Sequence, residues 1–106
     1  MGLSKKEGFT ASQNRLADLA KALAHPARIA ILEFLASSNA CMCGDIVEEL
    51  PLSQSTVSQH LRELKNAGLI KGDIDGTKVC YCIDEKAWVE AKSLLTRFLI
   101  DIKNCC

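Results

Sequence analysis

The six cysteines of this 106-residue chain fall into three close pairs: Cys41 and Cys43, Cys80 and Cys82, Cys105 and Cys106. A thiolate is a soft ligand, so it prefers soft ions such as trivalent arsenic, Cd²⁺ or Pb²⁺ to Mg²⁺ or Ca²⁺. Two thiols so close in sequence can chelate one such ion. The Cys-Met-Cys stretch at Cys41 and Cys43 is therefore a candidate metal site.

The N-terminal sequence MGLSKKEGFT predicts that these cysteines are mainly reduced. It lacks the apolar core of a signal peptide, and no later run reaches the roughly 18 apolar residues of a membrane span. We expect a cytoplasmic protein with no membrane partner. In a reducing compartment, paired cysteines favour metal binding, redox sensing or burial over a disulfide scaffold.

The composition predicts one folded domain over residues 1–106, since 48% of the residues are hydrophobic and 25% are charged. The formal net charge is zero, so any nucleic-acid binding must come from a local arrangement of side chains. Aromatic residues make up only 5%, which disfavours stacking on single strands. The chain has no recognisable nucleophile motif, acid/base motif or phosphate-binding glycine loop, so we expect neither an enzyme nor an obligatory cofactor.

Hydrophobic spacing predicts helices over 10–24 and 26–36, a short helix over 44–50, and a fourth from Gln54 to about Ala67 with Ser53 as its N-cap. The runs LIKGDIDG and TKVCYCI then read as a β-hairpin, and a last helix spans about 84–103. This order predicts a mainly α fold with a two-stranded β-hairpin wing, which is a winged helix-turn-helix.

The fourth predicted helix has two unlike faces. Val57, Leu61 and Leu64 share one side and anchor the helix. The other side carries groups that form hydrogen bonds or bear positive charge, as base edges and phosphates require. The predicted DNA contacts are Gln54, Ser55, Thr56, Ser58, Gln59, Arg62 and, in the hairpin, Lys78.

Several simpler interpretations stay open at this point. A Ser/Gln-rich face also suits an ordinary solvated helix, although the short helix, turn and hairpin around it favour DNA. Lys65 can also meet phosphate. His25 reads as a helix-start residue and His60 as a flank residue that can reach a phosphate. Cys80 and Cys82 lie two apart on a strand, so both side chains point to the same face. They could form a dithiol site or could simply be buried in the core.

Three stretches, KALAHPARIAILEFL, LSQSTVSQHLRELKNAGLI and GTKVCYCI, resemble in order and spacing the second helix, recognition helix and wing of ArsR/SmtB-type winged-helix repressors. The resemblance covers roughly residues 15–100 and points to the arsenic-responsive branch. It implies a homodimer that binds double-stranded palindromic operator DNA and leaves it when an effector arrives. It also implies that the first and last helices, about 10–24 and 84–103, form the dimer interface.

By the same resemblance, Cys41 and Cys43 match the cysteine pair at the start of the third helix in arsenic-, cadmium- and lead-responsive members. Residues i and i+2 of a regular helix point apart, so joint coordination requires a non-helical or distorted start. A third cysteine that arsenic-responsive relatives often have is replaced by Ile46. A third thiolate would come from Cys105 or Cys106, or two thiols would hold a monosubstituted organoarsenical.

The leading hypothesis is therefore a repressor released by trivalent arsenic, with Cd²⁺ or Pb²⁺ as other candidates. Zinc-sensing relatives bind their metal through histidine and carboxylate ligands on the last helix. This kind of sensor is disfavoured here because the predicted last helix has no histidine. A redox- or persulfide-sensing repressor is the alternative, although the predicted helix 26–36 lacks the cysteine that such relatives carry there. A further alternative is a protein-interaction module that does not bind DNA. Such a module would not show an affinity for duplex DNA that falls steeply with salt, as phosphate contacts require.

Overall fold

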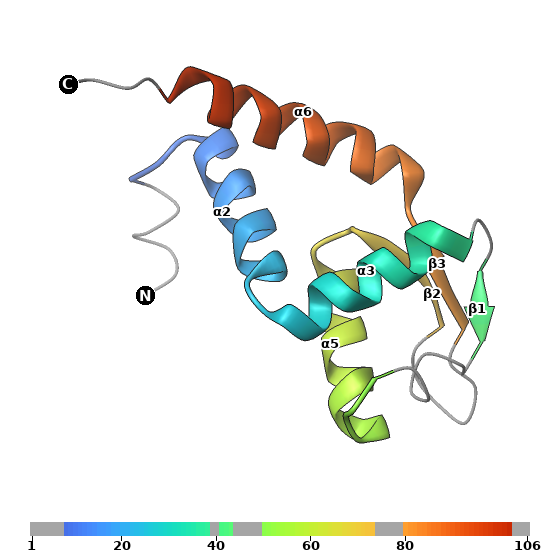
Figure 1. Ribbon diagram of the computed structural model, residues 1–106. Helices are drawn as coiled ribbons and strands as arrows, with labels where there is room; N and C mark the ends of the chain where they lie inside the picture. The colour runs from blue at the N-terminus through green and yellow to red at the C-terminus, as the bar shows by residue number, and fades with distance from the viewer. Residues whose placement is uncertain (1–7, 39–40, 44–49, 74–79, 103–106) are drawn as a thin grey trace.

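Four helices and a small antiparallel sheet make up the part of the chain that the computed structural model describes, residues 8–38, 41–43, 50–73 and 80–102 (Figure 1). The elements are α2 (Ala11–Leu23), α3 (Pro26–Ser38), β1 (Met42–Cys43), α5 (Gln54–Asn66), β2 (Ile70–Asp73), β3 (Cys80–Ile83) and α6 (Glu85–Asp101). The predicted mainly helical fold with a hairpin is confirmed. The short helix predicted over 44–50 lies outside the described residues except for Leu50.

The helix ends follow from local capping. The Thr10 hydroxyl accepts a hydrogen bond from the Gln13 amide, and the Gln13 side chain accepts one from the Thr10 amide, so a capping box starts α2. Ser53 caps α5 as predicted, since its hydroxyl accepts from the Thr56 amide at 3.3 Å. Gly68 follows α5 with a φ of +83°, the left-handed conformation that ends helices and that glycine adopts without strain.

The sheet has three strands in the order β1-β3-β2, whereas the sequence predicted only the hairpin pair. β2 and β3 form that hairpin, with Ile70 opposite Ile83. β1 pairs with the free edge of β3, which places Met42 opposite Tyr81 and Cys43 opposite Cys80. Residues 42 and 43 are therefore extended rather than the start of a helix, because their backbone completes a β-ladder instead of a helical turn.

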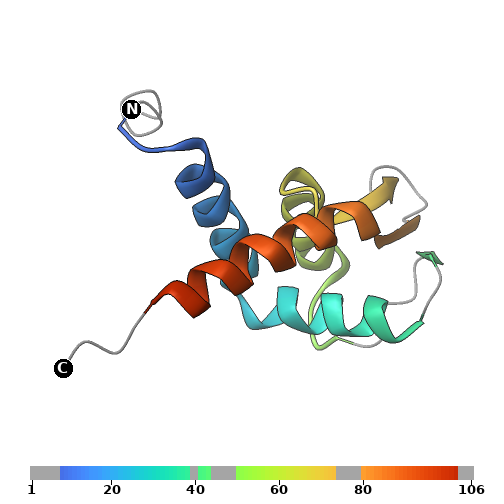
Figure 2. The same ribbon diagram turned by 90° about the horizontal axis from the view of Figure 1, so that it is seen from above.

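The core lies where α3, α5 and the sheet meet. The apolar side chains of α5 point into it as predicted, with Val57 and Leu64 fully buried and Leu61 1% exposed. Tyr81 fills the core from the middle of β3. α6 packs along α2 on the other side, and Figure 2 shows α6 crossing over that helix. The apolar side of α5 is thus packed into the core, and its other side is left on the surface.

We expect Leu64→Ala to lower the free energy of unfolding by about 2–5 kcal/mol, since the truncation leaves a cavity among well-packed neighbours. Leu64 is 0% exposed within the core cluster. Urea denaturation followed by circular dichroism measures the loss. A loss within the range of ordinary surface substitutions, about 0.5 kcal/mol, would contradict this packing.

Candidate functional site

The polar residues predicted on α5 lie together on its outward face. Ser55, Gln59 and Arg62 are exposed on successive turns, with Gln54 exposed at the start of the helix and Ser58 partly buried beside them. Four of these five side chains carry hydroxyl or amide groups that both donate and accept hydrogen bonds. The structure therefore brings the predicted groove-facing residues into one surface, which we call the α5 face.

Two of the predicted contacts differ from the rest. The Thr56 hydroxyl lies 2.9 Å from the Ser53 hydroxyl, so it belongs to the cap of the helix as well as to its surface. Lys78 lies outside the described residues. The single carboxylate of α5, that of Glu63, is exposed one turn after Gln59 and borders the α5 face.

Lys65 ties the helix to the sheet. Its ammonium group donates to the Gly72 carbonyl oxygen at 2.6 Å. Gly72 has a φ of +131°, and a Cβ there would collide with the backbone of Cys80 and Tyr81. The lysine that sequence reasoning assigned to phosphate thus holds β2 against the end of α5 in this structure.

His60 is a structural residue rather than a phosphate contact, because only 8% of it is exposed. The Arg28 Nε atom donates to its Nδ1 atom at 3.1 Å, and the ring centroid of His25 lies 4.4 Å away. His25 Nδ1 accepts from the Ala27 amide at 3.1 Å, which confirms its helix-start role. Together these contacts join the start of α3 to α5. Sequence reasoning missed Arg28, which lies 32 residues from His60.

Burial lowers the pKa of His60 below 6.5, nearby His25 and Arg28 lower it further, and Glu63 opposes them. The unfolded chain therefore binds the proton more readily than the folded chain, and stability falls as pH drops below about 6.5. We expect the free energy of unfolding to decrease between about pH 7.5 and about pH 5.5, and His60→Asn to reduce that decrease. Urea denaturation at both pH values measures it, and an unchanged decrease in the variant would refute the assignment.

Cys41 and Cys82 form a disulfide with Cα atoms 4.3 Å apart. The register explains the pairing, since Met42 opposite Tyr81 places residue 41 across from residue 82. Cys80 is disulfide-bonded as well, and its register partner on β1 is Cys43. The prediction that the cysteines are reduced thiols is therefore wrong for Cys41, Cys80 and Cys82 in this structure.

The structure thus bonds Cys41 to Cys82 on β3, whereas the prediction from the sequence was that Cys41 acts together with Cys43. Cys80 and Cys82 are partly buried, and Tyr81 between them occupies the core. The predicted extra ligands Cys105 and Cys106 lie outside the described residues. Within the described ranges no group of three histidine, cysteine or acidic residues is arranged to hold a metal ion. The repeated Cys-x-Cys spacing was the sequence signal that could have linked the two strands.

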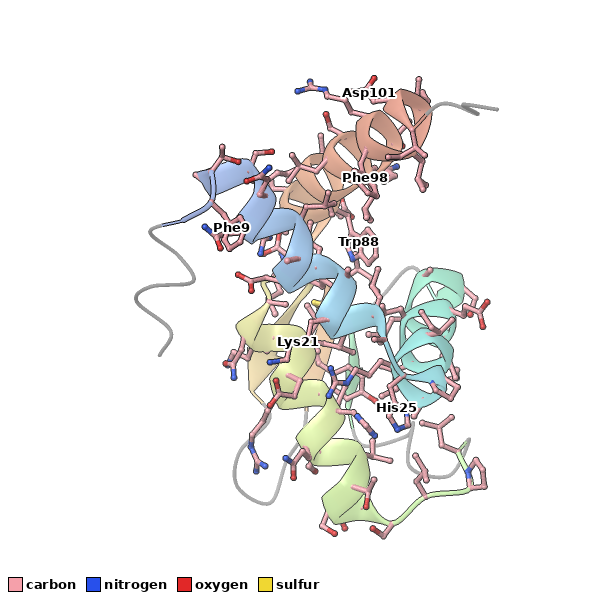
Figure 3. All side chains as sticks on the ribbon, turned by 90° about the vertical axis from the view of Figure 1, so that its left-hand side faces the viewer. Phe9, Lys21, His25, Trp88, Phe98 and Asp101 are labelled. Atoms are coloured by element: carbon pink, nitrogen blue, oxygen red, sulfur yellow. A yellow bond between two sulfur atoms is a disulfide. The ribbon has the colours of Figure 1, made fainter. Side chains whose placement is uncertain are left out.

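A large apolar surface lies at the far end of α6. Phe98, Leu99 and Ile100 are between 47% and 70% exposed, and Ile102 beyond the helix is 63% exposed. Phe9, just before α2, is 57% exposed. Figure 3 shows Phe98 on α6 and Phe9 just before the start of the neighbouring α2. The four residues of the last segment lie within the predicted dimer-interface range 84–103, and Phe9 lies next to the other predicted range, 10–24. Together these five residues form what we call the α6 apolar surface.

None of the helices in the described ranges is long and apolar enough to cross a bilayer.

Known proteins are similar to this chain in sequence and in fold. Residues 25–71 match the family model described as bacterial regulatory protein, arsR family. The chain is 36% identical over 77 residues to the HTH-type transcriptional regulator YgaV of Escherichia coli, covering 73% of this chain and 78% of that protein. It is 31% identical over 75 residues to the arsenical resistance operon repressor of Staphylococcus xylosus, covering 71% of each.

The fold agrees with a solved structure. The crystal structure of Rv0081 from Mycobacterium tuberculosis superposes with a TM-score of 0.60 at 31% identity, covering 88% of this chain and 97% of that one. The matched relatives are transcriptional regulators, which are not enzymes. The chain therefore belongs to the ArsR family of bacterial regulatory proteins.

Proposed function

We propose that this protein is a DNA-binding transcriptional repressor that leaves its operator when an effector reacts with cysteine thiols at β1. The observation that carries the proposal is the α5 face, which presents hydrogen-bonding side chains and Arg62 on a helix anchored by a buried apolar stripe. Such a helix fits the major groove of double-stranded DNA, where base edges offer donors and acceptors. Gln54, Ser55, Ser58 and Gln59 contact bases in this proposal.

The proposed repressor works as a homodimer. The α6 apolar surface is larger than scattered surface residues explain, and burial against a second copy would remove it from water. A two-fold dimer presents two copies of α5 to the two halves of a palindromic operator. The α2 and α6 segments, which pack together, supply the interface.

Trivalent arsenic is the effector we propose, with Cys41 and Cys43 as its first two ligands. Support comes from the soft character of thiolates and from the matched Staphylococcus xylosus protein, whose name is arsenical resistance operon repressor. The extended conformation of β1 removes the helical geometry that would turn residues 41 and 43 apart. Cys105 or Cys106 would supply a third thiolate, and Cd²⁺ or Pb²⁺ are competing effectors.

A second candidate effector is an oxidant, and the Cys41–Cys82 disulfide favours it. Two thiols would lose two protons and two electrons to a peroxide, which would leave as two waters. The disulfide would then link the β1 segment covalently to β3 and restrict the conformation of the chain that leads toward α5. This candidate keeps the same DNA-binding role.

The test is fluorescence anisotropy of the reduced protein on an inverted-repeat duplex from its own promoter, with arsenite titrated anaerobically. We expect wild type to release the duplex and the double variant Cys41→Ser/Cys43→Ser to stay bound. Affinity without arsenite should fall steeply with salt, as phosphate contacts require.

Cys105→Ser/Cys106→Ser is the matched control, because it also removes two neighbouring thiols. If arsenite still releases the duplex from this control, the response depends on the cysteines at β1 alone. If arsenite no longer releases it, Cys105 or Cys106 supplies the third ligand. Wild type that stays bound through excess arsenite would reject arsenic as the effector. Peroxide and Cd²⁺ titrations of the same complex then decide between the other candidates.

A further inference from the structure

A cavity of about 640 Å³ opens beside the Cys41–Cys82 pair. Its volume falls within the range of small-molecule sites, roughly 300–1,000 Å³. Both cysteines line it, together with apolar side chains from three elements of the fold. Those apolar residues are Leu32, Leu35, Ala36, Ile83 and Trp88. The cavity therefore lies between the second half of α3, the wing strand β3 and the start of α6.

The rim of the cavity carries no net charge. Glu33 and Glu85 oppose Lys71 and Lys92, and all four side chains are exposed. Such a rim gives no preference for an anion or a cation. Trp88 lines the cavity, and its indole nitrogen is buried with no hydrogen-bond partner among the described residues. The cavity thus suits an uncharged ligand with an apolar group.

We propose that a trivalent arsenical with one organic substituent binds Cys41 and Cys82, with its substituent in the cavity, whereas inorganic arsenite takes the Cys41 and Cys43 pair proposed above. Sulfur atoms close enough to bond to each other are close enough, once reduced, to share one arsenic atom. Such an arsenical needs only two thiols, so no third ligand from the tail is required. This inference rests on the proposed effector-released repressor.

The reaction balances without a change of oxidation state. The arsenical carries two hydroxyl groups and one organic group on trivalent arsenic. Each thiol gives its proton to one hydroxyl, two As–O bonds break, two As–S bonds form, and two waters leave. The disulfide must first be reduced, and a phosphine reductant does this by taking up the oxygen of one water while both thiols gain a proton.

Trp88 provides a direct readout, since it is the single tryptophan of the sequence and lines the cavity. We would titrate phenylarsine oxide into the full chain, reduced with a phosphine under anaerobic conditions, and follow Trp88 fluorescence. We expect the Trp88 signal to saturate with one arsenical in the cavity, and we use that signal rather than total arsenic because Cys43 and Cys80 form a second adjacent pair. Cys41→Ser and Cys82→Ser should each bind at least about 100-fold more weakly, because one sulfur cannot chelate. Cys43→Ser should bind within about threefold of wild type.

Ala36→Leu tests the cavity separately from the thiols, because Ala36 lines the cavity and carries no sulfur. We expect it to weaken phenylarsine oxide while leaving inorganic arsenite unchanged. Operator binding without effector confirms that each variant is folded.

Two results would overturn the inference. The first is that Cys43→Ser no longer binds phenylarsine oxide while Cys82→Ser still does, and the second is that the Trp88 fluorescence of wild type does not respond. Neither result touches the proposed function, which is tested by the release of operator with inorganic arsenite. Release that fails with both arsenicals, despite binding to Cys41 and Cys82, would instead reject the proposed function.

Discussion

Leu99→Glu is expected to yield a monomer whose operator affinity is weaker by about 100-fold or more, since the second half-site is then no longer held at high effective concentration. Leu99 is 68% exposed in the middle of the α6 apolar surface, and a carboxylate there would have to be buried without a partner at the interface. Sedimentation equilibrium measures the association state, and anisotropy on the inverted-repeat duplex measures the affinity.

Arg97→Gln is the matched control for this change. It alters the net charge by the same single unit, and Arg97 is an exposed residue on the polar side of α6. We expect it to remain dimeric with nearly full affinity. A Leu99→Glu protein that stays dimeric at micromolar concentration would place the dimer interface elsewhere, while circular dichroism of both variants excludes unfolding as the cause.

Gln59→Glu is expected to weaken operator binding by roughly 30-fold or more, because each bidentate base contact is worth about 1–3 kcal/mol and a dimer loses two. The substitution keeps the size of the side chain but removes its donor and adds a negative charge beside phosphates. Gln59 is exposed in the centre of the α5 face, so the folded core is untouched. Anisotropy with the palindromic duplex and with a scrambled duplex measures the change and its sequence dependence.

The loss from Gln59→Glu should greatly exceed that from Arg97→Gln, although both change the charge by one unit. Equal losses would mean that overall charge controls binding and that α5 does not enter the groove. A Gln59→Glu protein that binds at full strength would also mean that α5 does not enter the groove. The dimer should remain intact in both proteins, which separates this prediction from that for Leu99.

The helices and the hairpin could be predicted because their signals are local. The buried stripe of Val57, Leu61 and Leu64 and the cap at Ser53 each depend on neighbours within one or two helical turns. The same spacing indicated which side chains of α5 would face outward. Nothing beyond the helix itself was needed for that part of the site.

Contacts between distant segments could not be predicted. β1 has only two residues, too few for a recognisable alternation, so its pairing with β3 and the resulting Cys41–Cys82 bond across 41 residues were missed. His60 appeared to be a flank residue because its partner Arg28 lies on another helix. In both cases the contacting residue is brought close by tertiary packing. The spacing of residues within one segment contains no information about that contact.

The Cys41–Cys82 bond also makes part of the chain a covalent ring that contains α5 and β2. Closing a ring between residues that are 41 positions apart restricts the unfolded chain by about 4 kcal/mol in the chain-entropy model. Reduction opens the ring, so the thiol form of the protein is the less stable one. An arsenical that bridges the same two sulfurs would close the ring again, and the effector would then serve as a removable cross-link around the DNA-reading helix.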